Sequence, residues 1–261
     1  MRFGCFGLVK DVEAVANAGF DFIELNLREV ISLSDTEFQE LCGRMKAASL
    51  AADVISWILP AELDLTSEQT HYEQWRDYIA TGIARSVALG AKIWPIGNGR
   101  GRSIKPENGP REIQQQRMKD FFAQLAAQVR PAGIVVLMEP LGPDYSNHLL
   151  TLEDCISFVK DIHADNLKTM CDLRHLTSAG VPLSQIEVWQ DYIGHAHIDL
   201  PVGSKRRFPR SDDGYDYSEY FRIIQRIGAT RLSVEALHEQ TLSDGRESIA
   251  YMRQLLAATG K

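Results

Sequence analysis

The sequence predicts an α/β fold of the (β/α)8 barrel class, in a single domain that covers residues 1–261. Short apolar runs alternate with longer stretches of amphipathic pattern along the chain, eight times each. Eight such units in 261 residues fit this barrel well. The competing fold, an open doubly wound sheet, usually has a glycine-rich GxGxxG loop after its first strand, and no such loop follows residues 3–8.

Each element is predicted from a residue pattern. A short apolar run between turn residues indicates a strand, and apolar residues three and four positions apart indicate a helix face. Residues 68–89 carry one such stripe, and Thr151 is a good N-cap for the helix that follows it. The predicted strands are 2–8, 22–27, 49–56, 92–97, 134–139, 167–172, 194–200 and 231–236. The predicted helices are 10–18, 35–48, 68–89, 110–130, 152–163, 182–192, 217–227 and 243–258.

The composition limits the class of protein. The chain is 44% hydrophobic, so a large core is expected, and its net charge of −7 provides no general attraction for nucleic acid or an anionic membrane. The four cysteines form no CxxC pair, which indicates free thiols in a reducing cytosol. No secretory signal opens the sequence, and no apolar run approaches the ~18 residues of a membrane span. We therefore expect a cytoplasmic protein.

Four predicted strands end in a side chain that can bind a metal: Glu139, Asp172, His197 and Glu235. Such positions meet at the carboxyl-terminal mouth of a parallel barrel, where active sites are built. The three long loops, 98–109, 142–150 and 201–215, also follow strands and are expected at that mouth. Residues two apart in a strand share a face. The residues expected inside the barrel are Val135, Leu137, Glu139, Met170, Asp172, His195, His197, Asp199, Ser233 and Glu235.

Taken singly, each of these residues has a structural interpretation. A glutamate at a strand end is often a surface carboxylate, His195 and His197 could be hydrogen-bonded core histidines, and Asp172 could be a helix N-cap. Taken together, they favour a site, because several buried carboxylates without a cation would cost many kcal/mol. The mixed oxygen and nitrogen set predicts one divalent ion: Mn²⁺, Mg²⁺, Co²⁺ or Zn²⁺.

This donor set suits proton transfer beside a carbonyl group. Removing such a proton leaves an enediolate, whose negative charge a divalent metal can stabilise. One carboxylate can take the proton and a second, on the other face of the substrate, can return one. Glu139 and Glu235 come from different strands and are predicted to do this. His175, three residues after Asp172, is placed to donate a hydrogen bond to a substrate oxygen, or to serve as a loop contact.

The strings MEPL, CDLRH, HAHID and SVEAL, together with FDFIELNL, resemble the strands of the xylose isomerase-like TIM barrels. That superfamily includes sugar phosphate isomerases and epimerases, hydroxypyruvate isomerases and inosose dehydratases. The resemblance covers essentially the whole chain. It implies that Glu139, Asp172, His197 and Glu235 are the metal ligands, that Glu139 and Glu235 are catalytic and that His175 binds substrate. It also implies a small sugar-like substrate. Members of the superfamily are often dimers or tetramers, and the sequence leaves open whether this chain forms such a homo-oligomer.

The sequence leaves more than one interpretation open at several other positions. The superfamily often has a substrate-binding arginine after the seventh strand, and here Arg206 and Arg207 both qualify. Glu24 resembles a common family position on the second strand, or is a buried, paired acid. Trp57, Trp94 and Asn98 lie near strand ends and could line a sugar site or, for the tryptophans, pack in the core.

The loop after the fifth strand, GPDYSNHLL, lacks the second glutamate of the ketose 3-epimerases, which argues against epimerisation of free ketoses. The leading hypothesis is a metal-dependent isomerase or epimerase of a small sugar or hydroxycarbonyl compound. The alternatives are an inosose-type dehydratase, which is a lyase, and a barrel that binds sugar without catalysis. A DNA-repair endonuclease of this fold is disfavoured, because it needs a basic face and a multinuclear zinc cluster, whereas this chain has a net charge of −7 and only seven histidines.

Overall fold

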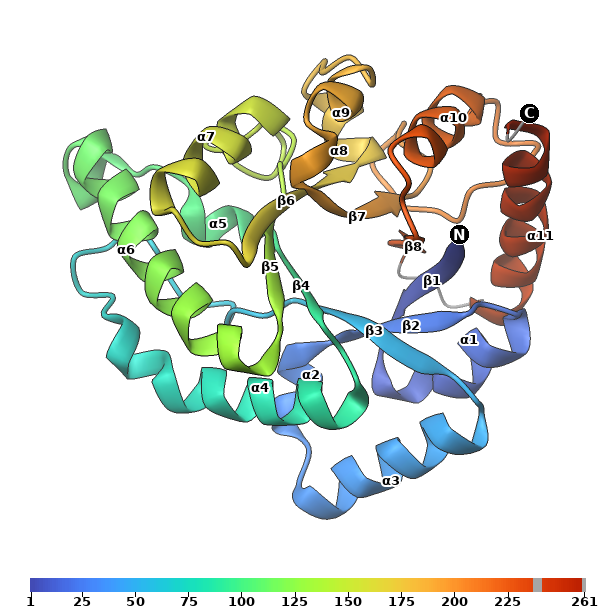
Figure 1. Ribbon diagram of the computed structural model, residues 1–261, viewed down its shortest axis with the longest axis horizontal. Helices are drawn as coiled ribbons and strands as arrows, with labels where there is room; N and C mark the ends of the chain where they lie inside the picture. The colour runs from blue at the N-terminus through green and yellow to red at the C-terminus, as the bar shows by residue number, and fades with distance from the viewer. Residues whose placement is uncertain (237–240, 260–261) are drawn as a thin grey trace.

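Eight parallel strands close into a barrel in chain order, with the first strand paired to the last (Figure 1). The structure is a computed structural model, and it describes residues 1–236 and 241–259. The strands are β1 (Arg2–Gly7), β2 (Phe22–Asn26), β3 (Ala51–Ser56), β4 (Ile93–Ile96), β5 (Val135–Met138), β6 (Leu167–Asp172), β7 (Ile193–Ile198) and β8 (Arg231–Val234). The predicted (β/α)8 barrel is confirmed, and each predicted strand overlaps an observed one.

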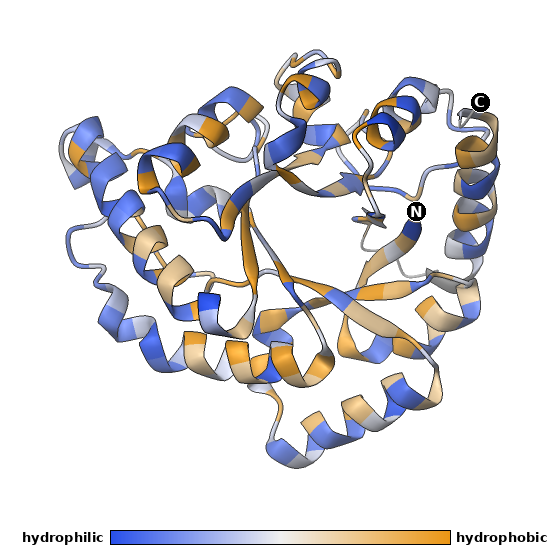
Figure 2. Cartoon of the chain, in the orientation of Figure 1, coloured by the Kyte–Doolittle hydropathy of each residue, from blue (hydrophilic) through white to orange (hydrophobic). Residues whose placement is uncertain are grey.

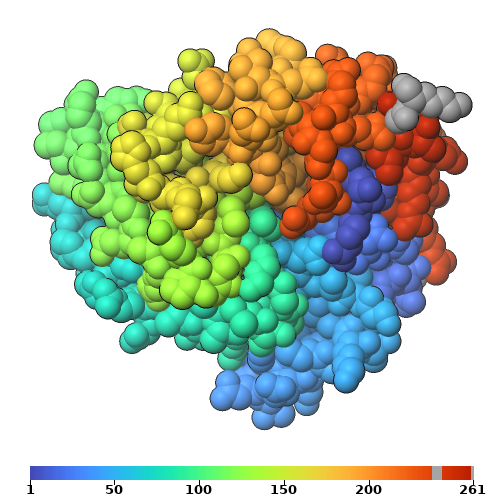
Figure 3. Space-filling model, in the orientation of Figure 1, coloured from blue at the N-terminus to red at the C-terminus, as the bar shows by residue number. Residues whose placement is uncertain are grey.

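Helices surround this barrel, and the final helix packs beside the first, so the blue and red ends of the chain adjoin (Figures 1 and 3). The helices are α1 (Val12–Ala18), α2 (Leu27–Ser32), α3 (Asp35–Ala47), α4 (Arg76–Leu89), α5 (Gly99–Arg102), α6 (Arg111–Val129), α7 (Leu152–Ile162), α8 (Leu173–Ser178), α9 (Gln185–Val188), α10 (Ser218–Arg226) and α11 (Thr241–Thr259). No helix in the described part of the chain has the length and apolar character that crossing a membrane requires.

Two predicted helices differ from the observed ones. The helix expected over 68–89 begins at Arg76, after a 3-10 turn at Tyr72–Trp75. Before that turn, Thr70 Oγ1 donates to the carbonyl of Asp64 at 2.6 Å, a local contact that competes with helix formation. The helix expected over 182–192 is divided into α9 and a second 3-10 turn, because the backbone at Trp189 leaves the helical region (φ −111°, ψ 20°).

Two short helices, α2 and α8, follow their strands without a loop, and the sequence patterns did not predict them. The Asn26 side chain accepts a hydrogen bond from the Arg28 amide at 3.0 Å, and Asp172 accepts one from the His175 amide at 2.9 Å. Each cap ends a strand and begins a helix. A helix of six residues is too short to show a clear period, so only the cap residues signal it.

The barrel separates two apolar clusters. Leu137 and Met170 belong to a small cluster inside the barrel, whereas Val136 and Met138 belong to the large cluster between the strands and the helices. The predicted alternation is therefore confirmed for these strands. Figure 2 shows the strands mainly in the hydrophobic colours and the helices in a mixture of both. Towards the carboxyl ends of the strands, polar side chains replace apolar ones on the inner face, and these build the candidate site.

Candidate metal centre and active site

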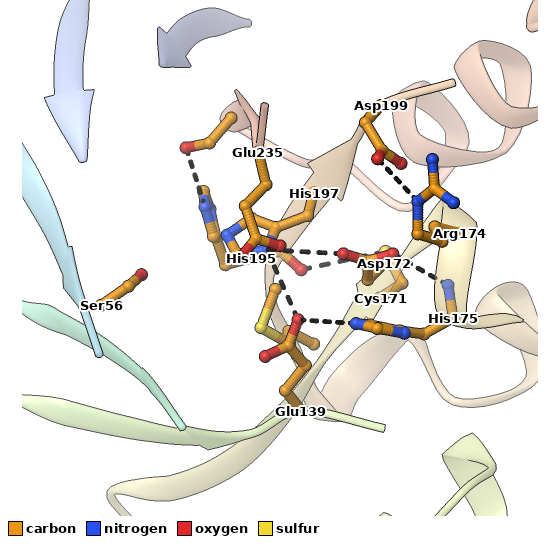
Figure 4. Close-up of polar contacts among 12 residues, drawn as sticks. Ser56, Glu139, Cys171, Asp172, Arg174, His175, His195, His197, Asp199 and Glu235 are labelled. Atoms are coloured by element: carbon orange, nitrogen blue, oxygen red, sulfur yellow. Dashed lines mark hydrogen bonds and ion pairs between the residues drawn. The ribbon is translucent and has the colours of Figure 1, made fainter. Parts of the chain in front are cut away.

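Four predicted ligands, Glu139, Asp172, His197 and Glu235, converge at the barrel mouth (Figure 4). They come from the ends of β5, β6, β7 and β8. His197 Nδ1 lies 3.3 Å from Glu235 Oε2, 3.5 Å from Glu139 Oε1 and 3.7 Å from Asp172 Oδ2. One donor atom from each residue lies within 4.8 Å of the other three. The structure thus brings together all four residues that the sequence placed in one site.

The chemistry of this group fits a divalent cation. Glu139 Oε1, Asp172 Oδ2, His197 Nδ1 and Glu235 Oε2 are each buried and make no hydrogen bond in the described part of the chain, although Arg206 forms ion pairs with Glu235 Oε2 and Asp172 Oδ2. These are the same four atoms that face one another. Burying three carboxylates and an imidazole without hydrogen bonds is costly even with one arginine beside them, and a cation among the four atoms would satisfy all of them. Three carboxylates and one imidazole form a mixed oxygen and nitrogen donor set of the kind that Mn²⁺ and Zn²⁺ accept.

Glu24 holds His197 from inside the barrel. Glu24 Oε1 lies 3.0 Å from His197 Nε2, and Glu24 Oε2 lies 3.3 Å from His195 Nε2. Ser56 donates to the same Glu24 carboxylate, and Ser233 Oγ lies 3.1 Å from His195 Nε2. Glu24 is therefore a fully buried, paired acid. Because Nε2 of His197 is hydrogen-bonded to Glu24, Nδ1 is the ring nitrogen that could bind a cation, as in the carboxylate–histidine–metal arrangement.

The electrostatics of this inner group follow from its burial and its partners. Burial raises the pKa of Glu24, but His197 and His195 lower it more, so its pKa lies well below the ordinary value. Burial lowers the pKa of His195 to about 4, so this ring is neutral near pH 7. We call Glu139, Asp172, His197 and Glu235 the metal group, after the ion that they could hold. For His197, burial also lowers the pKa, yet the carboxylates of Glu24 and of the rest of the metal group raise it well above the ordinary value. A cation at the site would replace that stabilising positive charge.

The structure distinguishes the two candidate arginines. Arg206 Nη1 lies 2.8 Å from Glu235 Oε2 and 3.6 Å from Asp172 Oδ2, and Arg206 Nη2 lies 3.0 Å from His175 Nε2. Arg207 lines a separate surface cavity with Phe208. Of these two arginines, Arg206 is therefore the one close enough to the metal group to contact a molecule bound there.

His175 also lies at the site, on α8. Its Nε2 is 3.8 Å from Glu139 Oε1, and its Nδ1 faces the backbone N–H of Gly142 at 3.2 Å. The ring of Tyr145 packs edge-on against His175, with 4.8 Å between the centroids. These contacts keep the imidazole beside the metal group, with one nitrogen facing Glu139.

A cavity of 340 Å³ opens above the metal group. Its polar lining includes Glu139, His175, His197, Arg206 and Glu235, and its other wall comes from the segments that follow β2, β3 and β4. Trp57 and Asn98 line this cavity. Trp94 does not, because it is fully buried and its Nε1 donates to Ser86 Oγ at 3.0 Å. Arg28 and Arg100 line the cavity too, and sequence patterns gave no sign of either.

Arg174 is another residue that the sequence did not single out, although it lies between Asp172 and His175. It is buried, and its Nε donates to Asp199 Oδ2 at 2.7 Å. Its Nη1 donates to the Gly203 carbonyl at 2.8 Å and its Nη2 to the Lys205 carbonyl at 3.1 Å. Arg174 thus fastens the loop after β7 immediately before Arg206, and thereby helps to place Arg206.

Comparison with known proteins identifies the family. The family model described as xylose isomerase-like TIM barrel matches residues 12–255, and the chain belongs to this family. A comparison with curated protein sequences finds no match.

Similar solved structures share the fold over nearly their whole length. D-psicose 3-epimerase from Clostridium cellulolyticum H10, solved with D-tagatose, is 17% identical, with 98% of this chain and 99% of that chain covered and a TM-score of 0.83. L-ribulose 3-epimerase is 21% identical, with 99% and 95% covered and a TM-score of 0.81. 3-Keto-D-glucoside 4-epimerase from E. coli is 17% identical, with 97% and 99% covered and a TM-score of 0.79.

Proposed function

We propose that this member of the xylose isomerase-like TIM barrel family is a divalent-metal-dependent isomerase or epimerase of a small sugar or hydroxycarbonyl compound. The observation that carries the proposal is the set of four buried donor atoms that face one another without hydrogen-bond partners in the described chain. The similar structures described above are sugar epimerases, which supports the same reaction class. Glu139 and Glu235 are the proposed catalytic pair.

A divalent ion, when bound, would polarise the substrate carbonyl and stabilise the negative charge that develops on its oxygen. The protein supplies the proton transfers. Glu139 and Glu235 immediately follow strands β5 and β8, so they approach a substrate in the cavity from different directions. Each carboxylate has two oxygens and can face the metal with one while it takes or returns a proton with the other. One glutamate removes the proton beside the carbonyl, and the other delivers a proton to the resulting enediolate.

His175 and Arg206 are proposed to bind the substrate. Both line the cavity and both lie next to a proposed catalytic glutamate, at 3.8 Å for His175 and Glu139 and at 2.8 Å for Arg206 and Glu235. Imidazole and guanidinium groups donate hydrogen bonds to sugar oxygens and fix their position. Trp57 gives the cavity an aromatic surface for the apolar face of a sugar ring or chain.

The proposal is tested by proton NMR in D₂O. The Mg²⁺-loaded protein is incubated with a panel of ketoses, ketose phosphates, hydroxypyruvate and inosose, and the C–H groups beside each carbonyl are followed. We expect solvent deuterium to enter at one carbon of one substrate, and we expect Glu235→Gln and Glu139→Gln to abolish this exchange. Glu153→Gln, at an exposed position in the first turn of α7, is the matched control and should retain the exchange.

The metal content of each variant is measured at the same time, so that loss of a base is separated from loss of the ion. A product that has lost water would assign the site to a dehydratase instead. Failure of any compound to exchange, with the metal demonstrably bound, would contradict the proposed proton transfer and favour a binding role.

A further inference from the structure

Arg28 presents to the active-site cavity a guanidinium group that forms no ion pair with the residues that the structure describes. It lies at the start of α2, immediately beyond the end of β2, and lines the same cavity as the metal group. Its Nε donates to the carbonyl of Leu59 at 2.6 Å, and its guanidinium carbon lies 5.5 Å from the centre of the Trp57 ring. Its two Nη groups have no hydrogen bond or ion pair with the residues that the structure describes. The guanidinium is thus fixed in place with two donor groups left for a ligand.

Arg206, which lines the same cavity, has the neighbouring carboxylates that Arg28 lacks. Arg206 lies within 4 Å of three carboxylates, and although burial acts to lower its pKa, these carboxylates raise it above the ordinary value. For Arg28, burial lowers the pKa, and the groups that oppose this, Tyr78 and Glu62, only partly offset it. Arg28 therefore carries a positive charge that is partly removed from water and that forms no ion pair with a described carboxylate, a state that a bound anion would relieve.

Arg28 and the metal group line the same cavity from different parts of the barrel. Arg28, Trp57 and Arg100 follow β2, β3 and β4, whereas the metal group comes from β5 to β8, so the two sets lie on different arcs of the closed barrel. Arg100 is exposed and has no ion pair with the described residues. Both sets line one cavity of 340 Å³. A small molecule with its carbonyl at the metal group can therefore extend its other end towards Arg28.

We propose that Arg28, assisted by Arg100, is an anion subsite, and that the substrate is a small sugar with a terminal phosphate or carboxylate group. A guanidinium fork binds either group through two parallel hydrogen bonds, and Trp57 lies beside it to contact the carbon chain. The subsite rests on the proposed function for the claim that its ligand is the substrate. The claim that it binds an anion stands on the geometry of Arg28 and is tested without turnover.

The test compares three matched three-carbon probes: glycerol, glycerol 3-phosphate and glycerate. Binding to the Mg²⁺-loaded protein is measured by isothermal titration calorimetry and by tryptophan fluorescence, with Trp57→Phe used to identify the signal from the cavity. We expect glycerol 3-phosphate, glycerate or both to bind at least about tenfold more tightly than glycerol. We expect Arg28→Gln to remove most of this preference and Arg28→Lys to keep part of it, because lysine retains the charge without the fork.

Arg222→Gln, at an exposed position on α10, is the matched control and should leave the preference unchanged. Because every variant carries the same ion, anion binding to the metal itself cannot produce a difference between Arg28 and its variants. Preference for the phosphate probe would identify a sugar phosphate as the ligand class, and preference for glycerate a sugar acid. Equal binding of all three probes, or an anion preference that survives in a folded, metal-loaded Arg28→Gln protein, would overturn the subsite.

The two proposals fail separately. Anion binding that depends on Arg28, without deuterium exchange in any substrate, would retain the subsite and contradict the reaction. Exchange into an uncharged ketose, with no anion preference, would retain the reaction and contradict the subsite.

Discussion

Replacement of Glu24 by glutamine should weaken metal binding although Glu24 does not reach the metal group. Glu24 accepts from His197 Nε2 at 3.0 Å and thereby directs His197 Nδ1 towards the other three ligands. The glutamine side chain has nearly the same shape but no charge. A hydrogen bond to a charged group stabilises by about 1.5–3 kcal/mol, and loss of such a partner behind a metal-bound histidine typically weakens affinity about 10–100-fold. The two ranges agree, since about 1.4 kcal/mol corresponds to tenfold.

The assay is a Mn²⁺ titration followed by electron paramagnetic resonance, which reports free Mn²⁺ directly and does not depend on activity. We expect Glu24→Gln to bind Mn²⁺ about 10–100-fold more weakly than the unmodified protein. Ser233→Ala is the matched control, because the Ser233 hydroxyl bonds His195 and makes no hydrogen bond to the His197 ring in the described chain, and it should change the affinity by less than about threefold.

Glu24 is fully buried, so the variant is first checked for a native circular dichroism spectrum. If Glu24→Gln does not fold, Ser56→Ala replaces it, since Ser56 donates to the same Glu24 carboxylate and its loss should weaken Mn²⁺ binding by a smaller factor. Unchanged Mn²⁺ affinity in a folded Glu24→Gln protein would refute the view that Glu24 orients His197.

Three further predictions concern stability and the β7 loop. Burial, with Arg111 and Arg102 nearby, lowers the pKa of His148 to about 4, so the folded state binds a proton more weakly than the unfolded state and stability should fall as the pH drops from about 6.5 towards 4. In urea unfolding, His148→Gln should reduce the decrease in unfolding free energy between pH 7 and pH 5 by about 1 kcal/mol. An unchanged decrease would contradict the view that protonation of His148 causes it. Arg174→Gln should raise KM for the substrate much more than it lowers Mn²⁺ affinity, because it frees the loop that carries Arg206; equal effects on both would contradict a positioning role. Leu137→Ala should lower the free energy of unfolding by about 2–5 kcal/mol, because Leu137 is fully buried inside the barrel, and a loss below about 1 kcal/mol in denaturant titration would contradict that packing.

Much of the fold could be predicted because it depends on local patterns. Leu137 and Glu139 alternate with Val136 and Met138 in the sequence, and the same alternation separates the inside of the barrel from its outside. Strand ends that carry a donor side chain must then meet at one mouth, so four candidate ligands from four strands could be placed together from the sequence alone. The starts and ends of the helices were less predictable, because contacts such as that of Thr70 with Asp64 decide them locally.

Residues outside the strands could not be placed in the same way. Arg206 and Arg207 are adjacent in a loop, and contacts between distant segments, among them those of Arg174 with the loop and of Arg206 with Glu235, determine which of them lies beside the metal group. Arg28 resembles an ordinary surface arginine in the sequence, since its role depends on where Leu59 and Trp57 lie in space. Such contacts join segments distant in the chain, and no periodic pattern records them.

The central claim is that Glu139, Asp172, His197 and Glu235 together bind one divalent ion. The most direct measurement is an anomalous difference map from a crystal of the protein grown with Mn²⁺. We expect one strong peak among the four residues, about 2.0–2.4 Å from His197 Nδ1 and from an oxygen of each carboxylate. Absence of a peak at full Mn²⁺ loading, or a peak located between Glu24 and His195 instead, would contradict it.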